Sequence, residues 1–394
     1  MPMKYDFDKI IDRRGTNSYK WDTPEEDGVI PMWVADMDFC TAPAVVQAVT
    51  RRAQHGIYGY VTVPEAYYQA TIDWFGTRHH WAIERDWILY TSGVVPAISA
   101  IIKAFTSPGD KVVVQQPVYN CFFSSIVNNG CEIVDNALIA MGDTYVMDYD
   151  DLEEKTKDAR VKLLLLCNPH NPAGRVWSKE ELSQVGKICA QNHVIVVSDE
   201  IHCELTMPGY DYMPFASISP ELQDRCITCV SPSKAFNTAG LQIANIVTNH
   251  PDWRKRIDRA INDNEVCDVN PFGVEALIAA YNQGADWLEE LRQYLWENYN
   301  VLKQYFAQHL PFCQVTKLEA TYLVWIDIKS TGLSSDQLTH LLLTEGKVMV
   351  NSGTIYGKAQ GEGYMRINIA CPRARMLEGL KRMAHVINRH VQTK

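Results

Sequence analysis

The stretch CITCVSPSKAFNTAGLQ, residues 226–242, carries the arrangement that decides the fold. Its first five residues form a short apolar run, which predicts a strand buried on both faces, and Lys234 follows shortly after that strand ends. Partial desolvation at such a position lowers the pKa of the amine toward roughly 7–8, and the neutral amine can then form a Schiff base with an aldehyde. Ser231 and Ser233 add hydroxyl donors that suit a phosphate. The alternative is that Lys234 is a solvated loop residue.

Four further apolar runs, each rich in Val, Ile or Leu, also predict strands that end in polar motifs. These runs are 86–90, 111–116, 161–167 and 193–198. Helical patterns separate most of the runs, as at 94–105 and 178–191, and this alternation is typical of a parallel sheet with helices on both faces. Ligands bind beyond the carboxyl ends of the strands in such sheets, so we expect all five polar motifs to meet at one site.

Composition and charge exclude several classes of protein. A chain of 394 residues is too long for a single compact core and predicts about two domains, and its 46% hydrophobic content speaks against disorder. A net charge of −10 disfavours nucleic acid and anionic membranes as partners. No apolar stretch is long enough to span a bilayer, and the charged residues 1–15 do not resemble a signal peptide. Eleven cysteines without such a peptide predict free thiols in the cytoplasm.

The chain is predicted to divide into three parts. Residues 1–45 form an extended, aromatic-rich arm that packs with the small domain, residues 46–285 form a large domain, and residues 286–394 form a smaller one. The small domain begins with a long amphipathic helix and continues through further runs, which are 321–328, 347–350, 364–370 and 373–390. We therefore predict an α/β fold, with a mostly parallel sheet flanked by helices in the large domain and a smaller α/β domain beside it.

Two charged residues lie where burial would be costly. Asp199 ends the run 193–198, where a buried carboxylate needs a cationic partner such as a protonated ring nitrogen. Capping of a following helix is the alternative. Arg366 is the single charge in the run 364–370, and a buried guanidinium is suited to a bidentate carboxylate. An internal salt bridge is the alternative for this residue.

Other residues give weaker indications of a binding site than Asp199 and Arg366 do. Gly93 precedes an apolar helix whose first N–H groups would form a phosphate cradle. Tyr119 offers a flat surface for stacking, although it could equally belong to the core, and Asn171 lies between two prolines that would hold its amide in place. The Cys226–Cys229 pair should point to opposite faces of a strand, and His202 with Cys203 lacks partners at zinc-type spacing, so no metal is predicted.

The motifs of this chain resemble those of the fold type I, pyridoxal-phosphate-dependent aminotransferase superfamily. The motifs concerned are NPHNPAG (168–174), SDEIH (198–202), SPSK (231–234) and Arg366. Within that superfamily the chain is similar to the bacterial cystathionine β-lyase and C–S lyase branch. This similarity extends from about residue 4 to the C-terminus, through WVADMDF (33–39), GIYGY (56–60), KAFNTAGLQ (234–242) and MRINIACPR (365–373).

The resemblance implies catalytic and substrate-binding roles for four residues. Lys234 would carry pyridoxal 5'-phosphate as a Schiff base and later move the substrate's Cα proton. Asp199 would pair with the pyridine nitrogen, so that the ring can accept electrons. Tyr119 would stack on the ring, and Arg366 would bind the α-carboxylate of an amino acid.

It also implies how the rest of the cofactor is held. Asn171 would bind the phenolic oxygen of the cofactor and help to bind the substrate, and His202 takes the place of a tyrosine found in many relatives. The phosphate would be surrounded by Gly93, Val94, Ser231, Ser233 and, from the neighbouring subunit of a homodimer, Tyr60. Gln242 replaces the arginine that many members use for this phosphate, which leaves its neutralisation open.

The activity implied is a carbon–sulfur β-lyase that cleaves cystathionine or cysteine S-conjugates to pyruvate, ammonia and a thiol. An aminotransferase would use every one of these residues, and a regulatory protein that binds a partner on the same fold is a further alternative. Substrate selectivity would come from the mouth of the site, for which Trp33, Tyr58 and Tyr356 are candidates.

Overall fold

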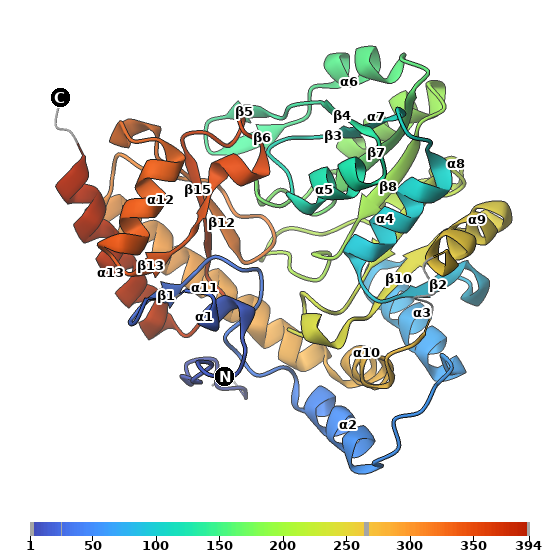
Figure 1. Ribbon diagram of the computed structural model, residues 1–394, viewed down its shortest axis with the longest axis horizontal. Coiled ribbons are helices and arrows are strands. Elements are labelled where there is room, and N and C mark those ends of the chain that lie inside the picture. The colour runs from blue at the N-terminus through green and yellow to red at the C-terminus, as the bar shows by residue number, and fades with distance from the viewer. Residues whose placement is uncertain (1–3, 25, 264–267, 392–394) are drawn as a thin grey trace.

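The computed structural model describes residues 4–24, 26–263 and 268–391 (Figure 1). The outermost residues of the predicted arm and small domain, 1–3 and 392–394, lie outside this description, as do Glu25 and residues 264–267. A seven-stranded sheet forms the centre of the larger part, in the order β2-β10-β9-β8-β7-β3-β4. Its strands are β2 (Ile88–Thr91), β3 (Lys111–Val114), β4 (Glu132–Asp135), β7 (Val161–Cys167), β8 (Ile195–Asp199), β9 (Cys226–Val230) and β10 (Ala244–Val247).

This sheet is mostly parallel, as predicted. Strands β4, β3, β7, β8 and β9 pair in parallel, whereas β10 pairs antiparallel with both β9 and β2. Strand β2 therefore runs in the same direction as the other five. All five strands predicted from apolar runs consequently end at one edge of the sheet, and this places their polar motifs together.

The strand boundaries differ from the expected ones in three places. The run 86–90 becomes a strand only at Ile88, because Arg85–Trp87 form a 3₁₀ turn. The run 111–116 ends its strand at Val114, and β8 spans Ile195–Asp199 rather than 193–198 because His193 has a positive φ of 58°. Strands β4 and β10 were not predicted, since neither belongs to a long apolar run.

The strands are buried on both faces because their side chains alternate between two hydrophobic cores. Leu163 and Leu165 of β7 point into a core shared with α4 (Val94–Phe105), α5 (Cys121–Asn128) and α9 (Pro251–Asn262), while Leu164 and Leu166 point into the main core. Cys226 and Cys229 fall into different cores, which confirms that they face opposite sides of β9. The other helices of this part are α2 (Pro43–Gln54), α3 (Glu65–His79), α6 (Tyr149–Thr156), α7 (Lys179–Gln191), α8 (Pro220–Gln223) and α10 (Pro271–Gln283).

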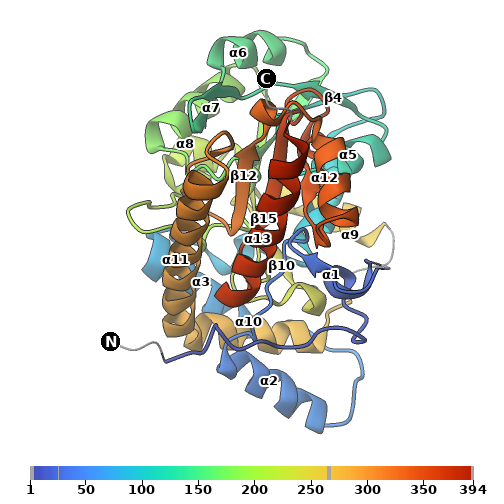
Figure 2. The ribbon, with the colours of Figure 1, turned by 90° about the vertical axis from the view of Figure 1, so that its left-hand side faces the viewer.

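The C-terminal part contains a second, antiparallel sheet covered by helices. Its strands are β11 (Gln314–Val315), β12 (Leu323–Asp327), β15 (Tyr364–Asn368) and β14 (Asn351–Ser352), in that order. Helices α11 (Ala285–His309) and α13 (Arg373–His390) lie side by side in front of this sheet (Figure 2), and α12 (Ser335–Thr344) completes the part. The predicted helices at 286–310 and 373–390 are therefore confirmed.

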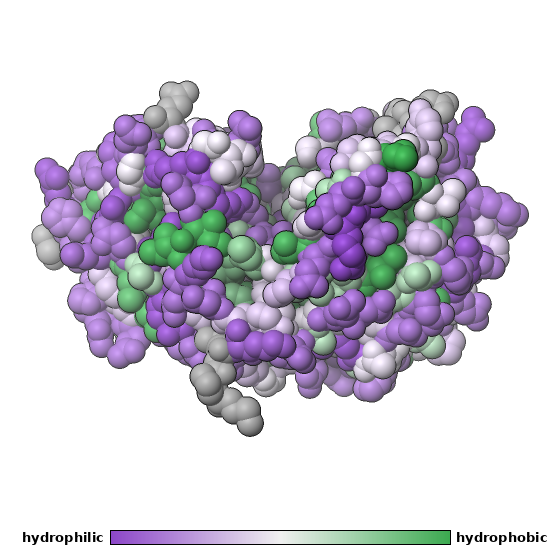
Figure 3. All heavy atoms as spheres, turned by 90° about the horizontal axis from the view of Figure 1, so that it is seen from below, coloured by the Kyte–Doolittle hydropathy of each residue, from purple (hydrophilic) through white to green (hydrophobic). Residues whose placement is uncertain are grey.

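The N-terminal segment is tied to the C-terminal part. Strand β1 (Ile30–Pro31) pairs in parallel with β13 (Val348–Met349), which makes a separate two-stranded sheet, and the short helix α1 (Tyr19–Asp22) precedes it. The domain boundaries at residues 45 and 285 stay a prediction. Figure 3 shows a largely polar face with an indentation between the two halves of the molecule. None of the helices in the described ranges is both long and apolar enough to cross a membrane.

The packing around two glycines predicts that alanine substitution has opposite effects on stability at the two positions. A Cβ at Gly353, which opens the turn that carries Tyr356, would collide with the carbonyl oxygens of Gly361 and Tyr364. We expect Gly353→Ala to lower the free energy of unfolding by roughly 2–4 kcal/mol. Gly76 lies within α3 with no atom within 4 Å of the added Cβ, so Gly76→Ala should stabilise the fold by about 0.5–1 kcal/mol. Urea unfolding of both variants measures this, and equal effects would contradict the packing around Gly353.

Candidate active site

A cavity of about 430 Å³ lies beyond the carboxyl ends of the parallel strands. Its wall combines residues from all three parts of the chain. The N-terminal segment contributes Trp33 and Ala35, the central sheet contributes the residues that follow its strands, and the C-terminal part contributes Asn351, Tyr356 and Arg366. The site thus forms only when the arm and both sheets are assembled around it.

Lys234 lies in this cavity, in the turn that follows β9. Its Nζ donates a hydrogen bond to the backbone oxygen of Ala35 at 2.7 Å. Burial, together with the positive charge of Arg366, lowers the pKa of Lys234 to about 8. The amine can therefore lose its proton near neutral pH, which a solvated loop lysine cannot do.

Asp199 is the last residue of β8 and is only 3% exposed. Its Oδ1 accepts one hydrogen bond, from the backbone N–H of Ile201 at 3.2 Å, and a series of turns rather than a helix follows it. The helix-cap alternative is therefore wrong. In the part of the chain that the structure describes, Asp199 has no ion pair, and burial raises its pKa to about 7. A carboxylate in this state is stabilised by any cation that enters the cavity.

Arg366 faces the same cavity from the middle of β15 and is also 3% exposed. Its Nη1 donates to Oδ1 of Asn171 at 3.1 Å and its Nη2 donates to the backbone oxygen of Trp33 at 2.8 Å. The guanidinium also lies over the ring of Tyr356, 4.7 Å from its centroid. No carboxylate pairs with Arg366 within residues 4–24, 26–263 and 268–391, and its Nε has no hydrogen-bond partner there. The salt-bridge alternative is therefore not observed.

Two neutral side chains line the wall between these charges. Burial, with the charges of Lys234 and Arg366, lowers the pKa of His202 well below its usual value, so its imidazole is neutral. The Nδ1 of His202 is buried and has no hydrogen-bond partner within the described ranges. Burial likewise raises the pKa of Tyr119, which lines the cavity as a neutral phenol. Both side chains can therefore contact a ring without adding charge to it.

The opposite end of the cavity has hydrogen-bond donors but no cation. Gly93 and Val94 open helix α4, whose first N–H groups have no partner within the helix. Ser233 and Gln242 also line the cavity, and Gln242 brings an uncharged amide to the wall. Among the described residues, Lys234 and Arg366 are the only lysine and arginine side chains on the cavity wall.

The structure brings most of the predicted site residues together, with two exceptions. Ser231 lies behind the wall, where its Oγ is hydrogen-bonded to the Ile243 oxygen at 2.6 Å and to Ser233 Oγ at 2.9 Å. Tyr60 is 94% exposed and outside this cavity. The predicted residues on the wall are Gly93, Val94, Tyr119, Asn171, Asp199, His202, Ser233, Lys234 and Arg366.

Of the three residues expected at the mouth of the site, two lie on the cavity wall and one does not. Trp33 and Tyr356 line the cavity, whereas Tyr58 donates to the Ala53 oxygen and lies outside. Sequence reasoning missed Tyr19, Cys121 and Asn351 on the wall. Cys121 stands two residues after Tyr119, which could have indicated it, but nothing in the local sequence of the other two points to the site.

The residues on the wall fit pyridoxal phosphate. A flat cationic ring would compensate Asp199, and the helix start at Val94 with Ser233 suits a phosphate. The unpartnered Nδ1 of His202 is available to a polar group of the ligand. Arg366, at the other side, retains donors for the carboxylate of an amino acid.

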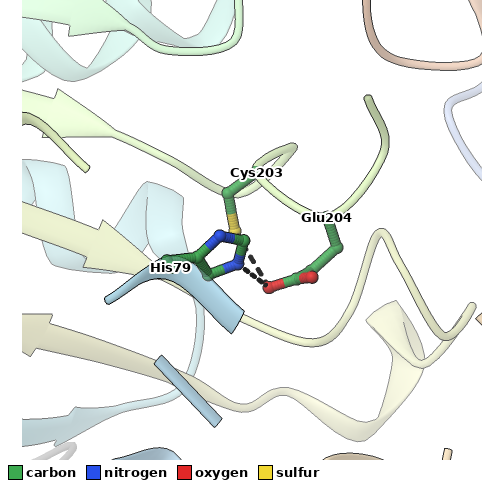
Figure 4. Close-up of side chains that lie close together, drawn as sticks. All are labelled: His79, Cys203 and Glu204. Carbon is green, nitrogen blue, oxygen red and sulfur yellow. Dashed lines mark hydrogen bonds and ion pairs between the residues drawn. The ribbon is translucent and has the colours of Figure 1, made fainter. Parts of the chain in front are cut away.

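His79, Cys203 and Glu204 form a cluster with metal-binding atom types (Figure 4). The oxygens of Glu204 are already engaged by protein donors, namely His79 Nε2 at 2.7 Å, Trp74 Nε1 at 2.7 Å and Arg78 Nε at 3.1 Å. Burial opposes the charge on Glu204, but His79 and Arg78 outweigh burial and lower its pKa to about 2. The cluster is therefore an ion-pair network that joins the end of α3 to the turn after β8.

Comparison with known proteins gives a consistent result over almost the whole chain. Residues 28–383 match the family described as aminotransferase class I and II. The chain is 42% identical to the cystathionine β-lyase PatB of Bacillus subtilis, over 96% of this chain and 98% of PatB. Cystalysin of Treponema denticola, whose structure contains pyridoxal 5'-phosphate, superposes with a TM-score of 0.95 at 34% identity, covering 98% of this chain and 100% of cystalysin. The pyridoxal-phosphate-bound C–S lyase of Staphylococcus hominis gives a TM-score of 0.92 at 33% identity, covering 98% and 99% of the two chains.

Because the pKa of Asp199 is raised, replacing this carboxyl group should stabilise the folded protein, and the gain should grow as the pH rises. The folded protein holds this proton up to about pH 7, whereas the unfolded chain releases it near pH 4. Stability is therefore lost as the pH rises through this window, by up to about 4 kcal/mol above pH 7. We expect cofactor-free Asp199→Asn to be more stable than the wild type at pH 8 and equal to it at pH 4. Thermal unfolding at both pH values measures this, and equal stability at pH 8 would contradict an unpaired buried carboxylate.

Proposed function

The chain belongs to the aminotransferase class I and II family, and on that basis we propose that it is a pyridoxal-phosphate-dependent carbon–sulfur β-lyase. Its substrates would be cystathionine or cysteine S-conjugates, and its products pyruvate, ammonia and a thiol. The observation that carries this proposal is the cavity itself, in which a titratable amine, an unpaired carboxylate and an unpaired guanidinium meet. The full-length likeness to a cystathionine β-lyase supports the lyase reaction within the family.

The substrate is oriented by the residues at the Arg366 end. The guanidinium binds the α-carboxylate, and its contact with Asn171 Oδ1 keeps the planar group in register. Stacking on Tyr356 holds the guanidinium from the other side. Since Arg366 and Lys234 line the same cavity, a bound amino acid has its Cα within the space that the lysine amine can reach.

The proton at Cα is taken by Lys234. When bound, pyridoxal phosphate supplies the ring that accepts the electron pair left behind by this proton. The amine of Lys234 can act as the base because its pKa is about 8, lowered by burial and by Arg366. Asp199 would pair with the ring nitrogen of the bound cofactor, and its negative charge would stabilise the protonated form of that ring. The thiolate departs without a strong acid, because the pKa of a thiol is only about 8.5.

The reaction type is tested by supplying L-cystathionine without any keto acid. We expect the wild-type enzyme to release pyruvate and thiol in equal amounts, measured by coupled reduction of pyruvate and by thiol titration. Arg366→Lys should retain the charge but lose bidentate binding, which lowers kcat/KM by roughly tenfold to a thousandfold. Turnover that requires a keto-acid acceptor would show an aminotransferase instead. Wild-type kcat/KM in the Arg366 variant would contradict the assigned carboxylate site.

We further propose that the enzyme is a cytoplasmic homodimer in which Tyr60 of one subunit reaches the phosphate of the other. Two observations support this. The loop around Tyr60 exposes apolar side chains, with Ile57 67%, Tyr58 59% and Tyr60 94% exposed, and such patches mark interaction surfaces. The phosphate end of the cavity has no cation from its own chain within the described residues. The ten cysteines of the described ranges are all free, which suits a reducing compartment.

Mixing two variants that are each impaired at limiting cofactor tests the shared site. Tyr60→Ala should weaken cofactor binding about tenfold or more, because it removes a hydrogen bond to a charged group. In a mixed dimer of Tyr60→Ala with Lys234→Ala, one of the two sites regains both native residues. We expect random reassociation to restore about a quarter of wild-type activity at limiting cofactor, given a twofold-symmetric dimer. A mixture no more active than its separate components would contradict a site shared between subunits.

A further inference from the structure

The segment from Trp33 to Met37 follows β1 with an irregular backbone and is here called the arm strand. Side chains from both larger parts of the chain bind it. The backbone oxygen of Ala35 accepts hydrogen bonds from Lys234 Nζ at 2.7 Å and from Tyr322 OH at 3.0 Å. The oxygen of Trp33 accepts from Arg366 Nη2 at 2.8 Å and from Asn351 Nδ2 at 3.1 Å. Both charged residues that face the ligand are therefore in contact with the arm strand.

Further contacts lock the same segment. The Asn368 amide donates to the Asp36 oxygen at 2.7 Å, and also to the oxygen of Val34. The side chain of Asn237, three residues after Lys234, accepts from the Met37 N–H at 3.0 Å and donates to the Met37 oxygen at 3.0 Å. Residues on both sides of Ala35 are thus hydrogen-bonded, and the Ala35 carbonyl has little freedom to move away from the lysine.

An ion cluster anchors the arm strand from its outer side. Arg13 binds both carboxylate oxygens of Asp36, at 3.2 and 2.8 Å, and binds Asp38 at 2.9 Å. Lys20 is 1% exposed, and its Nζ lies 3.2 Å from Asp38 and 3.5 Å from Asp36. A buried ammonium is tolerated only with such carboxylate partners. One ion pair from Lys20 and two hydrogen bonds from Arg13 therefore tie the Asp36 carboxylate in place.

We propose that Asp36, held by Arg13 and Lys20, is a positioning residue that keeps the Ala35 carbonyl and a negative charge at the nitrogen of Lys234. The carbonyl and the carboxylate come from neighbouring residues of one strand, so the same anchor places both. Arg366 lies on the other side of the lysine and repels its proton. Asp36 offsets that repulsion, and the balance decides the pH at which Lys234 becomes a base.

Among the described residues, the groups that interact most strongly with the charge of Lys234 come from several surrounding elements. They are Asp36 of the arm strand, Cys121 of α5, Asp199 of β8, His202 of the turn after β8 and Arg366 of β15. Burial and Arg366 lower the pKa of Lys234, while Asp36, Asp199 and Cys121 raise it. Loss of the Asp36 charge therefore favours the neutral amine, and release of Asp36 from Arg13 should act in the same direction.

This inference rests on the proposed function, since the readout is the holoenzyme's visible absorption. That absorption changes when the Lys234 nitrogen, joined to the cofactor, gains or loses its proton. We expect Asp36→Asn to lower the pH midpoint of this change by roughly half a unit to one unit. Arg13→Lys keeps the charge but loses the two-point hold on Asp36, so it should lower the midpoint by less. Asp38→Asn is the matched control, because Asp38 belongs to the same cluster but is not among the groups that face the lysine most strongly.

The outcomes are separable. Downward shifts in both the Asp36 and the Arg13 variants, with a smaller shift in the Asp38 variant, would establish the positioning role. An unmoved midpoint in Asp36→Asn, or equal shifts in all three variants, would overturn it. Should Asp36→Asn not fold, Arg13→Lys decides alone, since the Arg13 side chain is 23% exposed and its replacement leaves Lys20 in the cluster. A wild-type protein without any visible band after cofactor addition would instead refute the proposed function.

Discussion

Two buried charges of opposite sign dominate this structure. Asp199 and Arg366 face one cavity from different sheets, and neither has an ion-pair partner among the described residues. Leaving a charge buried without a partner costs several kcal/mol. Such a cost is sustained in a protein when a ligand supplies the missing counter-charges. A cationic ring bearing an amino acid with a free carboxylate provides both at once, and the rest of the site is arranged around that requirement.

Much of the fold follows from local patterns in the sequence. The strand that ends at Asp199 and the strand that precedes Lys234 are apolar runs buried on both faces, and strands of this kind can be recognised without knowledge of their neighbours. Because they are parallel, their polar ends had to meet, which is why Lys234, Asp199, Asn171 and Tyr119 were predicted together. Strand β10 escaped prediction because Asn245 interrupts its four residues and its antiparallel direction is set only by pairing with β2 and β9.

The parts of the site that could not be predicted come from contacts between distant segments. Asn351 reaches the wall because β14 pairs with β15, and nothing in its local sequence indicates that pairing. The contact of Lys234 with Ala35 joins residues 199 positions apart. Ser231 was expected beside the phosphate, but its hydroxyl is used internally by Ile243 and Ser233. Composition and periodicity describe a strand's faces, whereas these placements depend on how separate elements pack.

The central claim is that the Lys234 amine bonds covalently to the aldehyde of pyridoxal phosphate, and borohydride reduction tests it most directly. The holoenzyme is reduced, digested and analysed by mass spectrometry to find the modified residue. The account predicts a stable phosphopyridoxyl group on Lys234. Recovery of unmodified Lys234 from cofactor-saturated protein, or modification of another lysine in its place, would contradict it.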